Sequence, residues 1–84
     1  MPEDLATIQA QKVVDTRGTL CPAPVLAASK GIADVSVGGV MEVQATDYGA
    51  ASDLPAWARR TGHEFLGTVE EPGYLRLFVR KAGS

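Results

Sequence analysis

The chain has 84 residues, of which 45% are apolar and 21% charged, a balance typical of one globular domain too short to divide into two cores. Its net charge of −2 provides no basic field for nucleic acid, and no apolar run approaches the length of a membrane-spanning helix. The acidic first residues lack the apolar segment of a secretory signal, and Cys21 is the only cysteine. We therefore expect a cytoplasmic protein without an intramolecular disulfide.

The first third of the chain predicts an arm, a strand and a helix. Residues 1–11 are polar and weakly patterned, as in a flexible N-terminal arm. The β-branched run at 12–15 predicts a strand, and "TRG" then turns the chain. The following segment, from Cys21 to about residue 33, predicts a helix with one apolar face formed by Val25, Leu26 and Ile32.

The middle of the chain predicts a buried strand and a second helix. Residues 40–45 are largely apolar and fit a strand, whereas 49–61 has the helical period. Asp47 is the expected N-cap of this helix, and Gly62 stands where a left-handed C-cap belongs. Because Pro55 lacks a backbone N–H, we expect a kink or a new helix start near it.

The last segment predicts a β-hairpin. Apolar and polar residues alternate over 74–80, a second strand is expected at 64–69, and Pro72-Gly73 between them favours a type II turn. The order is then βαβαββ within a single domain over residues 12–84. Two helices are too few to cover both faces of a four-stranded sheet. An α+β two-layer sandwich is therefore expected, with a mixed sheet and both helices on one face.

The surroundings of Cys21 indicate a chemical role for its thiol. If the helix begins at Pro22, Cys21 is its N-cap, and the positive end of the helix dipole favours the thiolate. Pro24 stiffens the first turn, and Gly18 permits a tight backbone turn before the cysteine. We expect both prolines to fix the position of the sulfur more than they stabilise the fold. The alternative is a buried structural cysteine that acts as a small apolar side chain.

The motif Asp15-x-x-Gly18-x-x-Cys21-Pro22-x-Pro24 resembles the signature of the TusA-like (SirA-like) sulfur-carrier family. The resemblance extends through "TDYGAASDLPAWARRTGHEFL" and the final hairpin. It implies a two-layer βαβαββ fold and a persulfide carried on Cys21, with no other cofactor. It also implies a cysteine desulfurase or rhodanese-like protein as donor, and a thiol-containing protein as acceptor, in tRNA thiolation or sulfur oxidation. We expect a monomer without direct contact to nucleic acid or membrane.

The chain departs from the family pattern at three positions. Tyr48 follows Asp47 where many relatives have proline, and Leu20 precedes Cys21 where some members have arginine. Ala58 stands where some members have a second cysteine in the second helix. None of these differences removes the carrier thiol.

Other polar residues are weighed first as structural. Asp15 and Asp47 follow predicted strands, so we expect turn or capping roles, with tuning of the thiol second. Arg17 lies further back in the same loop, and Arg59 ends the second helix, where it faces solvent or an acidic partner. His63 is expected to be structural; one histidine and one cysteine are too few ligands for zinc, so no metal is expected.

Three functions of different classes remain open on the residues alone. The leading hypothesis is a sulfur carrier that works through Cys21, because one thiol suffices to accept and pass on a sulfane sulfur. A nearby second thiol would release sulfide and leave a disulfide, so the single cysteine argues against a Cys-x-x-Cys oxidoreductase. The alternatives are a binding or regulatory module without thiol chemistry and a redox sensor whose cysteine is oxidised.

Overall fold

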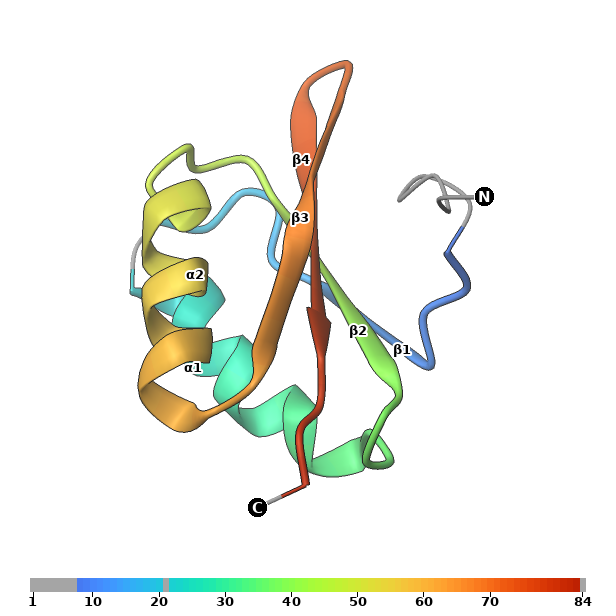
Figure 1. Ribbon diagram of the computed structural model, residues 1–84. Coiled ribbons are helices and arrows are strands. Elements are labelled where there is room, and N and C mark those ends of the chain that lie inside the picture. Colours follow the sequence, from blue (N-terminus) through green and yellow to red (C-terminus); the bar gives the residue numbers. More distant parts are fainter. Residues whose placement is uncertain (1–7, 21, 84) are drawn as a thin grey trace.

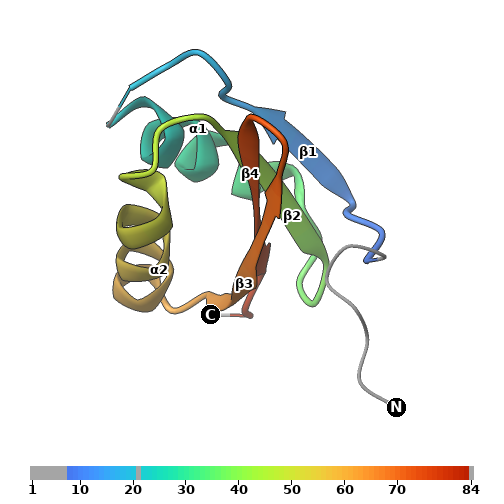
Figure 2. The ribbon, with the colours of Figure 1, turned by 90° about the horizontal axis from the view of Figure 1, so that it is seen from above.

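The computed structural model describes residues 8–20 and 22–83, so the first seven residues of the expected arm lie outside it. These residues form a four-stranded sheet with both helices packed on one face (Figures 1 and 2). The expected two-layer fold is confirmed. In spatial order the strands are β1 (Lys12–Asp15), β2 (Val40–Ala45), β4 (Tyr74–Arg80) and β3 (Glu64–Glu71), and the helices are α1 (Ala23–Gly31) and α2 (Ala50–Thr61).

The sheet is mixed because its strands are joined in two different ways. β1 and β2 are parallel and connected by α1, whereas β4 pairs antiparallel with both β2 and β3. The hairpin between β3 and β4 turns at Pro72-Gly73, where Gly73 has φ +86°, the value that the second central position of a type II turn requires. Strand β3 ends two residues later than expected, at Glu71, and the register shifts between Phe65 and Gly67.

Helix α1 packs through small side chains. Its buried residues are Pro24, Ala28 and Gly31, whereas Leu26, expected on the apolar face, is exposed. A Cβ at Gly31 would lie 2.7 Å from Cγ2 of Val14, so glycine at this position lets the helix approach the sheet closely. The short 3-10 helix η2 (Ile32–Asp34) continues α1, and its Ile32 is buried as expected.

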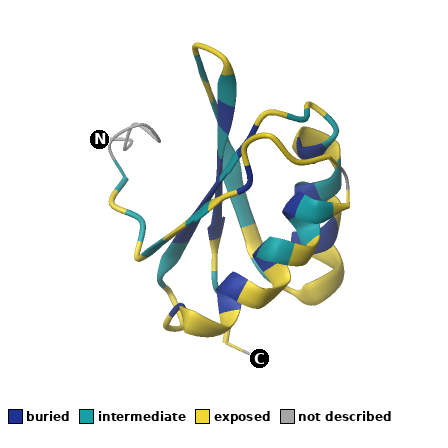
Figure 3. Cartoon of the chain, turned by 180° about the vertical axis from the view of Figure 1, so that it is seen from behind, coloured by how far each residue is buried: buried dark blue, intermediate teal, exposed yellow. Residues whose placement is uncertain are grey.

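Helix α2 buries Leu54, Trp57 and Ala58 against the sheet and α1. It runs from residue 50 to 61 as one helix, so the new start expected near Pro55 is absent from this segment. Gly62 ends it in the left-handed conformation, with φ +87°, and the next N–H donates to the Ala58 carbonyl at 2.8 Å. Between the layers lies a core to which β2 and β4 contribute alternate residues. In Figure 3, where the chain is coloured by burial, buried segments fall on the strands and on parts of both helices.

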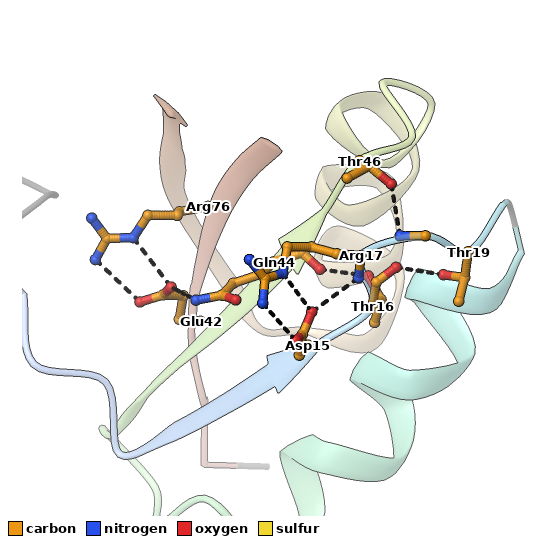
Figure 4. A network of polar contacts seen from close by, with 9 residues as sticks. Asp15, Thr16, Arg17, Thr19, Glu42, Gln44, Thr46 and Arg76 are labelled. Atoms are coloured by element: carbon orange, nitrogen blue, oxygen red, sulfur yellow. Dashed lines mark hydrogen bonds and ion pairs between the residues drawn. The ribbon is translucent and has the colours of Figure 1, made fainter. Parts of the chain in front are cut away.

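The face of the sheet that the helices leave uncovered is polar but not fully exposed. Phe78 is completely buried there, opposite Glu42 on β2, and the Arg76 guanidinium lies 5.2 Å from its ring centroid. Arg76 also donates to both carboxylate oxygens of Glu42, at 3.1 and 3.2 Å (Figure 4). Among the residues that the structure describes, no helix has the length and apolar character needed to cross a membrane.

Candidate functional site

Two loops meet where the parallel strands β1 and β2 end, in the upper half of Figure 1. Hydrogen bonds from two residues of the first loop, Thr16 and Gly18, join it to the end of β2 and to the loop that follows β2 (Figure 4). Thr16 donates its backbone N–H and its hydroxyl to the Gln44 carbonyl, at 2.8 and 2.7 Å. The Gly18 N–H donates to Oγ1 of Thr46 at 2.9 Å. The β1–α1 loop, which contains the motif cysteine, is therefore held against the β2–α2 loop.

The β1–α1 loop turns tightly between Thr16 and Leu20. Thr19 donates both its N–H and its hydroxyl to the Thr16 carbonyl, at 3.2 and 2.6 Å. Gly18 has φ +84°, a conformation that L side chains rarely adopt, although a Cβ there would meet no atom within 4 Å. Its backbone conformation, rather than space, accounts for glycine at this motif position.

Helix α1 begins one residue later than expected, so its cap residue differs from the expected one. The cap residue is Pro22 and not Cys21, because a turn precedes the helix in which the Ala23 N–H donates to the Leu20 carbonyl at 2.8 Å. The Leu26 N–H donates to the Pro22 carbonyl at 3.0 Å, and neither proline has an N–H. Cys21 itself lies outside the described residues, and its role as nucleophile stays a prediction.

The two motif prolines have different environments. Pro22 is exposed at the cap of α1, whereas Pro24 is fully buried in its first turn. The sequence assigned both residues to the positioning of the sulfur. The structure separates them: Pro24 also belongs to the packing of α1 on the sheet.

We therefore expect Pro24→Ala to lower the free energy of unfolding by about 1–2 kcal/mol, because it removes buried ring atoms and restores freedom to the unfolded chain. Pro22→Ala removes exposed atoms, so it should change stability by less than about 1 kcal/mol while slowing sulfur loading severalfold through misplacement of the neighbouring residue. Urea unfolding and the rate of loading from polysulfide measure the two effects. Equal losses of stability in the two variants would contradict this separation.

Asp15 and Arg17 form one closed unit in the β1–α1 loop. Nε and Nη2 of Arg17 each lie 3.0 Å from a carboxylate oxygen of Asp15, and the Arg17 N–H donates to Oδ1 at 3.0 Å. These bonds, the side-chain bond first, lower the pKa of Asp15. The guanidinium also lies 5.2 Å from the ring centroid of Tyr74 on β4. The pair thus stabilises the loop on the side of the sheet opposite the helices.

Of the other polar residues weighed from the sequence, Asp47 lies in the β2–α2 loop, whereas Arg59 and His63 lie at or after the far end of α2. Asp47 is not the N-cap of α2, which is Gly49; its Oδ1 instead accepts the Gly49 N–H at 3.0 Å within the β2–α2 loop. Arg59 lies nine residues after the first residue of α2, about 13 Å along the helix, so the structure does not bring it to this site. His63 has a structural contact: its Nδ1 accepts the Ala82 N–H at 3.1 Å.

The sequence did not single out the threonines that join the two loops. Thr16 and Thr46 each directly follow a strand of the parallel pair, and Thr16 is buried. A hydroxyl directly after each of two parallel strands was the available signal, because those strand ends meet at one edge of the sheet. Across the described segments 8–20 and 22–83, no group of three or more His, Cys, Asp or Glu residues is placed to hold a metal ion.

The βαβαββ order, with a four-stranded mixed sheet and two helices on one face, identifies the chain as a small two-layer α+β domain. The fold resembles that of a SirA-like protein from Desulfitobacterium hafniense, with a TM-score of 0.73 over 86% of this chain and 99% of that one, at 23% identity. The family model described as sulfurtransferase TusA matches residues 12–81. The chain therefore belongs to the TusA sulfurtransferase family, and the family expected from the motif is confirmed.

Relatives at higher identity come from several organisms. The chain is 46% identical over 76 residues to the putative sulfur carrier protein YrkF of Bacillus subtilis, covering 90% of this chain but only 41% of YrkF. It is 41% identical over 69 residues to a putative sulfur carrier protein of Archaeoglobus fulgidus, covering 82% of this chain and 94% of that protein. The sulfur carrier protein TusA of Allochromatium vinosum is 38% identical over 69 residues, which are 82% of this chain and 91% of that protein.

Proposed function

We propose that this protein is a sulfur carrier that accepts a sulfane sulfur on Cys21 as a persulfide and passes it to the thiol of an acceptor protein. The observation that supports it is the Cys-Pro-x-Pro motif of a TusA-family chain, which stands between the β1–α1 loop and the first turn of α1. Leu20 and Pro22, on either side of Cys21, are both exposed. Gly18, bound to Thr46, fixes the approach of the chain to this point.

The transfer needs no oxidant or reductant. The Cys21 thiolate attacks the outer sulfur of a donor persulfide; one S–S bond forms, another breaks, and the donor cysteine leaves as a thiolate. In the second step an acceptor thiolate attacks the outer sulfur of the Cys21 persulfide, and the Cys21 thiolate leaves. The outer sulfur keeps its proton throughout, so each step conserves atoms and charge.

A carrier of this kind acts between a sulfur donor and a sulfur acceptor. We assign the donor role to a cysteine desulfurase or a rhodanese-like protein, and the acceptor role to a protein thiol in tRNA thiolation or sulfur oxidation. A reducing cytoplasm suits a persulfide on a single cysteine, because the compartment disfavours disulfides. The carried sulfur is covalently bound cargo, and the mechanism requires no further cofactor.

Intact mass measurement after incubation with a sulfane donor such as polysulfide tests this function. We expect the mass to rise by one sulfur atom and to return to the original value after treatment with dithiothreitol. Fragmentation should place the added sulfur on Cys21. A mass gain only of oxygen or glutathione would instead support a redox sensor, and no adduct at all would support a binding module; either result would contradict the carrier.

A further inference from the structure

The two most exposed large apolar side chains of the described residues stand on the loops that follow β1 and β2. Leu20 on the β1–α1 loop is 75% exposed, and Tyr48 on the β2–α2 loop is 72% exposed. Single exposed apolar residues are ordinary on protein surfaces. Here, however, the two residues stand on the two loops that the structure holds together at one end of the domain. Two exposed apolar side chains on neighbouring loops are typical of a surface that binds another molecule.

A hydrogen bond between the two loops limits how far apart Leu20 and Tyr48 can lie. Leu20 is two residues from Gly18 and Tyr48 is two residues from Thr46, and the Gly18 N–H donates to Oγ1 of Thr46 at 2.9 Å. The length of the chain then limits the two Cα atoms to a separation of about 20 Å at most, well within one protein–protein interface. Pro22, two residues after Leu20, is exposed at the start of α1. Leu26 is also exposed and follows Pro22 by four residues, about one helical turn. We call Leu20, Pro22, Leu26 and Tyr48 the apolar collar.

Arg17 and Asp47, the charged residues of the same two loops, each contact another group of the protein. Arg17 is held by Asp15 in a two-point ion pair, with both contacts at 3.0 Å, and lies against Tyr74. The Asp47 carboxylate accepts the Gly49 N–H at 3.0 Å. The collar residues themselves carry no charge, and the two charged side chains of these loops have partners within the protein.

Sulfur transfer brings a partner close to the collar. A partner sulfur that attacks a persulfide on Cys21 approaches within bonding distance of a residue whose chain neighbours are Leu20 and Pro22, with Cα atoms 3.8 Å away. Resting on the proposed function, we infer that the apolar collar is the recognition surface for the sulfur-transfer partner. The partner is a protein whose reactive cysteine is flanked by apolar side chains rather than by charged ones.

Peptide acceptors test this preference without knowledge of the natural partner. The loaded protein is mixed with short peptides whose single cysteine is flanked by leucine and phenylalanine, by glutamate, or by lysine. Each rate is divided by the rate of the same peptide with glutathione persulfide, which corrects for the reactivity of its thiol. We expect the apolar peptide to accept sulfur about tenfold faster than either charged peptide after this correction. The preference should persist at high salt, because it does not depend on charge.

Variants locate the preference on the collar. Leu20→Gln and Tyr48→Ser should each reduce it severalfold while loading from polysulfide stays at the wild-type rate. Val37→Gln is the matched control, because Val37 is 67% exposed but precedes β2, at the opposite end of this strand from the loop that carries Tyr48. Equal corrected rates for all three peptides, or equal loss of preference in the Val37 variant, would overturn the inference. Failure of the wild type to load from polysulfide would instead contradict the proposed function and the inference with it.

Discussion

Replacement of Cys21 by serine is expected to abolish sulfur acceptance while the domain stays folded. Cys21 is the only cysteine of the chain, so no second thiol can take over. A serine hydroxyl is almost entirely protonated at neutral pH and does not form a stable bond to sulfane sulfur, so the expected loss is complete. Labelled polysulfide followed by gel filtration measures the sulfur retained by each protein.

The fold should tolerate this change because serine and cysteine are nearly isosteric, and the described hydrogen bonds of the β1–α1 loop are made by other residues. Thr16 and Gly18 bond to β2 and the β2–α2 loop, and Ala23 bonds to Leu20. We expect wild type and variant to have the same urea midpoint within error. Label retained by the folded serine variant would show that sulfur binds elsewhere and would contradict the assignment of Cys21.

Arg76→Leu is expected to cause the largest loss of stability among single polar substitutions, about 3 kcal/mol. The Arg76 side chain is 17% exposed and the Glu42 side chain 7% exposed, so the variant leaves a buried carboxylate without its two-point partner. Arg76 also bonds to Glu71 at 3.1 Å, and this contact is lost as well. Urea unfolding at neutral pH measures the difference.

Arg80→Leu provides a matched control on the same strand. Arg80 pairs with Glu64 at 3.2 Å, but both side chains are exposed, so its loss should cost less than about 1 kcal/mol. Similar losses in the two variants would show that burial of the Glu42–Arg76 pair has no special importance.

The pH dependence of stability follows from the same contacts. Burial raises the pKa of Glu42, but the hydrogen bonds from Arg76 and Gln44 outweigh it, so the pKa lies below its ordinary value. The stability that this carboxylate contributes is therefore present above the pKa of the unfolded chain, about 4.3, and is lost as the pH falls through the lower folded value. In Arg76→Leu the burial of Glu42 still raises its pKa, but the bond from Arg76 no longer lowers it. The ionised carboxylate therefore destabilises the variant at neutral pH, and this cost disappears when the pH falls and Glu42 takes up a proton. The difference from wild type should narrow at acidic pH; a constant difference would contradict this explanation.

The strands could be predicted closely because their pattern is local. β1, β2 and β4 have the expected bounds, since alternation or β-branched runs mark them; glycine directly precedes β2 and β4, and the turn after β1 contains Gly18. The packing face of α1 could not be predicted in this way. Pro24, Ala28 and Gly31 carry little apolar area, and they are buried because the helix approaches Val14 closely. The hydrophobic period placed Leu26 inside, whereas it is exposed.

The candidate site was predictable where a short motif defines it and not where distant residues meet. Gly18 and the prolines are recognisable in one stretch of sequence, although the helix start was placed one residue early. The bond from Gly18 to Thr46 joins residues 28 positions apart, and the bonds from Arg76 to Glu42 join residues 34 apart. Such pairings depend on strand order, which the local pattern does not determine. For the same reason the sequence left Arg59 as a candidate, although it lies toward the opposite end of α2.

The central claim is that sulfur both enters and leaves this protein through one cysteine. The most direct measurement loads the protein with labelled sulfane sulfur, removes the donor, adds one equivalent of a thiol peptide, alkylates the mixture after a short reaction time, and follows the label by mass spectrometry. The account predicts that the peptide gains the labelled sulfur as a persulfide while the protein returns to its unloaded mass, without an added reductant. Label that stays on the protein, or that appears only as free sulfide, would contradict it.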